Sequence, residues 1–129
     1  MTDRNRFGKR FREFRRRAQL TQRQLAQKLD LDYTYISKIE GGAVPPPPRE
    51  RIEAAAAVFR LSQVERDELL LLAQEVPADM EQWIVTDPNA LLFYRSLAQH
   101  STSDQAALLK ELIQKLEQRH RKSRHSTKD

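Results

Sequence analysis

The side chains that most often carry catalysis are scarce in this chain and poorly placed for it. The three histidines, His100, His120 and His125, lie far from any paired acidic residue, so no metal-ligand spacing or catalytic triad is present. Cysteine is absent, which excludes a disulfide framework, a thiolate zinc site and a cysteine nucleophile. There is no glycine-rich phosphate loop. We therefore expect a protein that is not an enzyme and that uses no metal or cofactor.

The chain is rich in basic side chains, and they are unevenly distributed along the sequence. Residues 1–51 carry 13 basic and 6 acidic side chains, residues 52–117 carry 5 and 11, and residues 118–129 carry 5 and 1. A strongly basic block attracts a polyanion, because Lys and Arg side chains that neutralise phosphates release condensed counterions. The simpler alternative is a solvated helix face. The amino-terminal block is thus a candidate for nucleic-acid binding.

Helices must position these cations. Ala, Leu, Gln, Glu, Lys and Arg make up more than half of the 129 residues and glycine only three, a composition typical of an all-α fold. The length suits one compact domain, or a small domain with an appendage. The longest apolar run, residues 54–59, is too short to cross a bilayer, and the amino terminus lacks the features of a secretory signal. We expect a cytoplasmic protein with no membrane partner.

Residues 5–42 show the pattern of short helices separated by a tight turn. Apolar residues recur at helical spacing from about residue 5 to 19, and Thr21 with Gln24 forms the capping box of a second helix. Asp32 is a natural N-cap for a third helix, YTYISKIE, which Gly41 and Gly42 end. This spacing predicts a helix-turn-helix, in which the second helix of the pair enters the DNA major groove.

The segment FGKRFREFRRRAQLTQRQLAQKLDLDYTYISKIEGG resembles the DNA-binding domain of Cro and the lambdoid repressors, the regulators of the xenobiotic response element family. The resemblance implies a five-helix domain, which we place in residues 1–75. A helical dimerisation region at 76–118 and a disordered basic tail at 119–129 would follow it. We expect a homodimeric repressor that binds double-stranded DNA with a two-fold symmetric operator.

The resemblance also implies which side chains read bases. It places four residues on the groove-facing side of the third helix: Tyr33, Thr34, Ser37 and Lys38. Lys38 can donate to guanine O6 and N7, and Thr34 can touch a thymine methyl group or donate a hydrogen bond. Tyr35 stands at the margin, where its ring either borders the groove or covers a gap in the core.

Contacts to the DNA backbone are expected from a second set of residues. The resemblance implies that Gln22, at the start of the second helix, hydrogen-bonds a phosphate. The loop GGAVPPPP supplies no basic residue, so further phosphate contacts are expected from Arg10, Arg23, Lys28 and Arg49.

Members of this family also pair an acidic residue at the end of the recognition helix with an arginine of the first helix. Glu40 and Arg15 stand at those positions. Arg15 follows Phe11 by four residues and so lies on the inward flank of its helix. We expect a structural ion pair that holds the helices in place rather than a DNA contact.

Two apolar helices are candidates for a two-fold interface. The helix at residues 64–73 is apolar on nearly every side, and a leucine stripe runs through residues 108–116. The residues that we expect to form the dimer are Leu69, Leu72, Leu108, Leu109, Leu112 and Leu116. The alternative is that both segments build a satellite core within one chain. A short helix at residues 78–85 is expected to bury Met80, Trp83 and Ile84.

Other readings of the same sequence remain open. An antitoxin would use the same DNA-binding domain to regulate its own operon while its acidic body covers a toxin protein. An adaptor would use the helical head to bind protein or RNA. The resemblance further suggests a partner metallopeptidase, since some short repressors with helical extensions are inactivated by cleavage of the extension.

Overall fold

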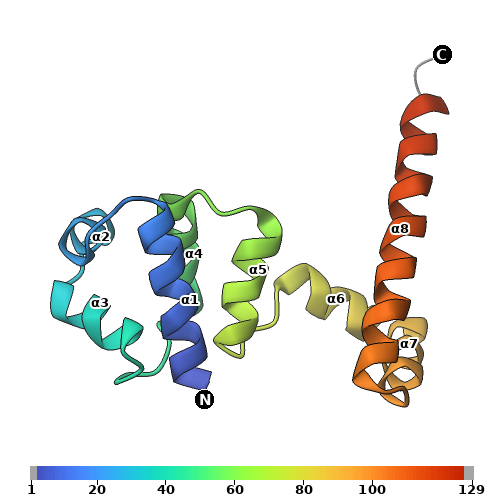
Figure 1. The fold of residues 1–129 in the computed structure, drawn as a ribbon, viewed down its shortest axis with the longest axis horizontal. Helices are drawn as coiled ribbons and strands as arrows, with labels where there is room; N and C mark the ends of the chain where they lie inside the picture. The colour runs from blue at the N-terminus through green and yellow to red at the C-terminus, as the bar shows by residue number, and fades with distance from the viewer. Residues whose placement is uncertain (1–2, 127–129) are drawn as a thin grey trace. The chain divides into compact units, whose positions relative to one another are not determined.

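The computed structural model describes residues 3–126, and this part of the chain consists of α-helices and the turns between them (Figure 1). The all-α fold predicted from composition is therefore confirmed. The chain forms two compact units, Met1–Glu81 and Gln82–Asp129. This division lies six residues beyond the predicted boundary between residues 75 and 76.

Unit 1 contains the helices that the repressor-like pattern predicts. They are α1 (Asp3–Arg17), α2 (Gln22–Leu29), α3 (Tyr33–Glu40), α4 (Arg49–Phe59) and α5 (Gln63–Leu72). Local chemistry sets where these helices begin. Reciprocal capping boxes start α2, at Thr21 and Gln24, and α5, at Ser62 and Glu65. α1 lies at the centre of the unit, in contact with α3, α4 and α5 (Figure 1).

The phenylalanine stripe of α1 forms the middle of the core. Phe7, Phe11 and Phe14 are all almost fully buried. The ring of Phe11 stacks on that of Phe7, with centroids 5.7 Å apart, and meets the ring of Phe59 edge-on at 5.3 Å. Aromatic pairs in these arrangements add stability beyond their buried area. The core therefore holds α1 rigidly against the other helices of unit 1.

The structure contradicts the expectation that Leu69 of α5 belongs to a dimer interface. Leu69 is fully buried in the core of unit 1, and Leu72 packs against that core half-buried. α5 is apolar on several sides because it closes the core as the fifth helix of the unit. The prediction of Leu69 as a dimerisation residue is therefore wrong, whereas Leu72, which keeps part of its surface exposed, stays a prediction.

α6 (Ala78–Thr86) crosses the boundary between the units, and its apolar side chains are not buried as expected. Met80, Trp83 and Ile84 are all exposed. Apolar residues at helical spacing show that a helix has an apolar face, but they do not show which element covers it. The predicted burial of these three residues is thus wrong for the chain described.

Unit 2 contains α7 (Pro88–Ala98), α8 (Thr102–Ser126) and the end of α6. Asp87 caps α7 and Pro88 occupies its first turn. α8 continues to Ser126, so the structure contradicts the disordered tail expected from residue 119. The segment lacks apolar residues, but Gln, Arg and Lys are good helix formers and cations are favourable near a helix C-terminus. Residues 127–129 of the predicted tail lie outside the described residues.

Candidate nucleic-acid interface

Short-range contacts set both ends of α3. At its start the carboxylate of Asp32 accepts hydrogen bonds from the backbone nitrogen of Thr34 at 2.8 Å and from its hydroxyl at 2.7 Å. The hydroxyl, followed by the backbone amide, lowers the pKa of Asp32. At the other end Gly42 has a φ of 74°. This positive φ turns the chain sharply after the helix. A Cβ at Gly42 would also lie 2.0 Å from the side-chain oxygen of Asn5.

α3 has one buried and one open face. Ile36 and Ile39 are buried in the core. The residues predicted to contact bases are all exposed: Tyr33, Thr34, Ser37 and Lys38. Because the Thr34 hydroxyl donates to Asp32, the methyl group and the oxygen lone pairs of Thr34 are what remain for a base. The open face is therefore available to a ligand.

Two tyrosines of α3 meet arginines of neighbouring helices. The guanidinium of Arg23 lies 4.2 Å from the ring centroid of Tyr33, a distance at which a cation–π interaction is favourable. Arg23 therefore stands beside the first residue of α3. Tyr35 packs half-buried against the core, the second of its two predicted positions, and Arg51 lies 5.5 Å from its ring.

Glu40, the last residue of α3, joins three helices. Its carboxylate accepts from Arg15 Nε at 2.6 Å and from Arg15 Nη2 at 2.9 Å, and Arg15 Nη1 donates to the carbonyl of Leu20. The ion pair predicted from the sequence is thus present as a two-pronged contact. Two further donors reach the same carboxylate, Arg12 Nε at 3.2 Å and Gln22 Nε2 at 3.1 Å. This cluster fixes α3 relative to α1 and α2.

Opposing influences act on the Glu40 carboxyl. Burial, the strongest of them, would raise its pKa because it disfavours the charged form. The hydrogen bonds and charges of Arg15, Gln22 and Arg12 together outweigh burial and hold the pKa below its ordinary value. Glu40 is therefore a carboxylate at neutral pH.

A glycine allows α1 and α3 to approach closely. A Cβ on Gly8 would lie 2.4 Å from the carbonyl oxygen of Ile39 and 2.6 Å from that of Glu40. Real side chains do not occupy such distances, so any other residue would push the helices apart. The sequence analysis missed Gly8, although a glycine inside an amphipathic helix is a signal of close backbone approach.

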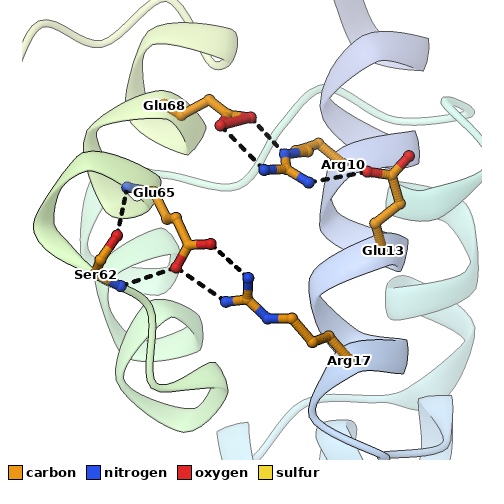
Figure 2. A network of polar contacts seen from close by, with 6 residues as sticks. All are labelled: Arg10, Glu13, Arg17, Ser62, Glu65 and Glu68. Carbon is orange, nitrogen blue, oxygen red and sulfur yellow. Dashed lines mark hydrogen bonds and ion pairs between the residues drawn. The ribbon is translucent and has the colours of Figure 1, made fainter.

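The structure places Arg10 away from the open face of α3. Arg10 forms a two-pronged ion pair with Glu68 of α5, by Nε at 2.5 Å and by Nη2 at 3.2 Å, and also bonds Glu13 (Figure 2). The bond to Glu68, despite some burial, raises the pKa of Arg10. Arg10 is engaged between α1 and α5, so the structure contradicts its predicted role at a phosphate. Arg10 and Arg12 are only two residues apart, and the sequence does not show which of them faces α5.

Arg17 makes the second link between α1 and α5. Its guanidinium bonds both oxygens of Glu65, one of them at 2.9 Å, while Glu65 also completes the capping box of Ser62 (Figure 2). Arg17, followed by the backbone at Ser62, lowers the pKa of Glu65 to about 2. These pairs hold α5 on the unit and leave two cations of the basic block unavailable to a polyanion.

The remaining predicted phosphate contacts differ in their surroundings. Lys28 is exposed near the end of α2. Arg49 donates to the carbonyl of Val76 at 2.7 Å and to Glu75 at 3.3 Å, which ties the start of α4 to the segment after α5. Of these two cations, Arg49 is paired with an acid, whereas Lys28 forms no ion pair with a described residue.

The architecture defines a class of protein. Two short helices, α2 and α3, are joined by a tight turn and pack against each other, and α3 packs on α1 while its other face stays open. Residues 6–69 match the family model of a helix-turn-helix domain, and this half of the chain therefore belongs to that family. Its similarity to Cro and the lambdoid repressors, predicted from the residue pattern, agrees with this match. No curated protein and no solved structure gave a significant match.

The family match bears on the broad function. A helix-turn-helix domain points to a DNA-binding regulator, and this class is typically non-enzymatic. Within residues 3–126, no group of His, Cys, Asp and Glu side chains is arranged to hold a metal ion. The same part of the chain has no helix with the length and apolar character that crossing a membrane requires.

Proposed function

We propose that the protein is a sequence-specific transcriptional regulator, a homodimeric repressor that inserts α3 into the major groove of its operator. The open face of α3 is the observation that carries the proposal. Its residues match the chemistry of base edges, because Lys38 offers donors to guanine and Thr34 offers a methyl group to thymine. Tyr33, held by Arg23, would border the sugar–phosphate backbone at the start of the helix.

Contacts to the backbone would fix the position of α3 in the groove. Gln22 and Arg23 at the start of α2 and Lys28 near its end lie on the helix that precedes the reading helix. In helix-turn-helix complexes this helix crosses the DNA backbone. Contacts of this kind carry no sequence information, but they supply much of the affinity.

The exposed apolar surface of unit 2 supports the dimer. Side chains of the α8 stripe, Leu108, Leu109, Leu112 and Leu116, are between 37% and 54% exposed. A groove of about 320 Å³ between α7 and α8 is lined by Phe93 and three leucines together with polar and charged side chains such as Glu111. Among the described side chains of unit 2, Ala90 alone is buried. Exposed apolar side chains in this number support an interaction site, and a second copy would cover them while supplying the second reading helix.

Duplex binding tests the proposal directly. Fluorescence anisotropy of the full chain with a labelled duplex should show an affinity that falls by orders of magnitude between about 50 and 200 mM salt. Lys38→Ala should relax the preference at one base pair by about 1–3 kcal/mol, whereas Lys110→Ala on α8, a matched control, should leave it unchanged. A Lys38→Ala protein that keeps its full sequence preference would contradict the proposed insertion of α3 into the major groove.

Sedimentation of the purified chain tests the dimer in the absence of DNA. The proposal predicts twice the chain mass of 15.1 kDa. A stoichiometric second polypeptide on unit 2 would instead favour the antitoxin function, because the same surface would then be covered by a toxin protein.

A further inference from the structure

Donors from two different helices converge on one oxygen atom. Arg12 of α1 and Gln22 of α2 both donate to Oε1 of Glu40, at 3.2 and 3.1 Å. Their donor nitrogens therefore lie within about two hydrogen-bond lengths of each other. Whatever ligand approaches Gln22 also comes within reach of Arg12.

Arg12 and Gln22 each have further hydrogen-bond donors. Besides Nε, a guanidinium carries four hydrogens on its two Nη nitrogens, and a side-chain amide carries a second N–H. Among the side chains that the structure describes, none accepts a hydrogen bond from these remaining donors of Arg12 and Gln22. Three or more donors are thus left for an acceptor-rich ligand.

The charges of the cluster do not cancel. Glu40 contributes one negative charge, while Arg12 and Arg15 contribute two positive charges. The side chain of Arg15 is only 10% exposed, whereas that of Arg12 is 42% exposed. The surplus positive charge is therefore at the surface, on Arg12, and a ligand anion with several oxygens complements it.

We infer that Arg12 joins Gln22, whose phosphate contact the resemblance already implies, in binding one backbone phosphate of duplex DNA, with Glu40 as the positioning group behind them. This inference rests on the proposed function, because it takes DNA as the ligand of α2 and α3. The two non-bridging phosphate oxygens accept from Arg12 Nη and from Gln22 Nε2. Arg12 thus replaces Arg10 as the arginine of α1 that touches DNA.

The salt dependence of binding tests the site. Arg12→Gln removes one phosphate contact, so the slope of log affinity against log salt concentration should become shallower by about one unit. Affinity at low salt should fall about tenfold, by the same factor for operator and for unrelated duplex. Arg17→Gln is the matched control. It removes the same charge from α1 on the side that faces α5, and its slope should equal that of the parent.

Two further variants separate binding from folding. Arg12→Lys keeps the charge but loses the planar fork, so the parent slope should persist with an intermediate affinity. Arg12→Gln combined with Gln22→Ala should lose less than the sum of the single losses, because both act on one phosphate. Far-UV circular dichroism should show the helix content of the parent in each variant.

The outcomes distinguish the site from the function. If Arg12→Gln binds duplex with the affinity and salt-dependence slope of the parent, the proposed phosphate site is wrong and the proposed function is unaffected. A loss confined to particular base pairs would also overturn the site, since a phosphate carries no sequence information. A parent protein that binds no duplex would instead overturn the proposed function, and the site with it.

Discussion

Replacing Glu40 by glutamine removes the one negative charge at the junction of α1, α2 and α3. The side chain of Glu40 is fully buried and that of Arg15 nearly so, and their two-pronged contact has distances of 2.6 and 2.9 Å. Glutamine keeps the shape and one acceptor oxygen, but it leaves the Arg15 guanidinium buried without a counter-charge.

Breaking a buried ion pair by removing one partner costs about 3–5 kcal/mol. Arg15 still donates to the carbonyl of Leu20, and the remaining acceptor of glutamine is retained, so we expect a loss near the lower limit, about 3 kcal/mol. Such a loss is a large share of the 5–15 kcal/mol that stabilises a typical domain. Replacing both residues, as Arg15→Met with Glu40→Leu, should recover most of it because no charge stays buried alone.

Urea denaturation followed by circular dichroism measures this loss, with Glu13→Gln as a control because Glu13 is exposed on α1. The pH dependence gives a second readout. The folded pKa of Glu40 lies below its ordinary value, so its stabilisation is complete above about pH 4.5 and is lost as the pH falls through the folded pKa. The difference between the parent and Glu40→Gln should therefore shrink in acid. A loss of less than about 1 kcal/mol at pH 7 would refute the view that this pair fixes α3.

Three further predictions follow from other contacts. Gly8→Ala should lower the free energy of unfolding by about 1–3 kcal/mol in urea denaturation, because the methyl group would overlap the carbonyl of Ile39. This loss should exceed the gain from the better helix propensity of alanine. Unchanged stability would contradict the close approach of α1 and α3. Glu65 has a folded pKa of about 2, so the stability that it contributes is complete above its ordinary pKa of 4.5 and is lost between that value and pH 2. In acid denaturation, the stability of Glu65→Gln should therefore depend less on pH over this range than that of the parent. An identical pH profile would contradict the pairing of Glu65 with Arg17. Leu112→Glu should convert the proposed dimer to a monomer in sedimentation. It should also weaken operator binding about a hundredfold, because two linked reading helices bind more tightly than one. A dimer of unchanged stability would mean that the interface lies elsewhere.

The features that sequence predicted well are local. The capping box at Thr21 and the N-cap at Asp32 depend on residues within three positions, and each begins a helix in the structure. The periodicity of the α1 phenylalanines likewise depends on one helix alone. Such signals are legible because no distant part of the chain is needed to interpret them.

The features that sequence could not resolve depend on which elements meet. α1 carries arginines on every side, and only the positions of Glu68 and Glu40 decide that Arg10 faces α5 while Arg12 faces the start of α2. Leu69 illustrates the same limit, because an apolar helix must be covered but its sequence does not say whether the cover belongs to the same chain. The end of α8 shows a different limit: the lack of apolar residues from residue 118 onward predicts disorder, whereas the segment is helical to Ser126, in line with the helix propensity of Gln, Arg and Lys.

Selection of bound duplexes from a random pool by the purified full chain tests the central claim most directly. The account predicts a two-fold symmetric consensus whose half-sites are about one helical turn, roughly 34 Å, apart, because two copies of α3 must enter successive major grooves on one face of the DNA. Recovery of an asymmetric single site, or of no preferred sequence at all, would contradict it.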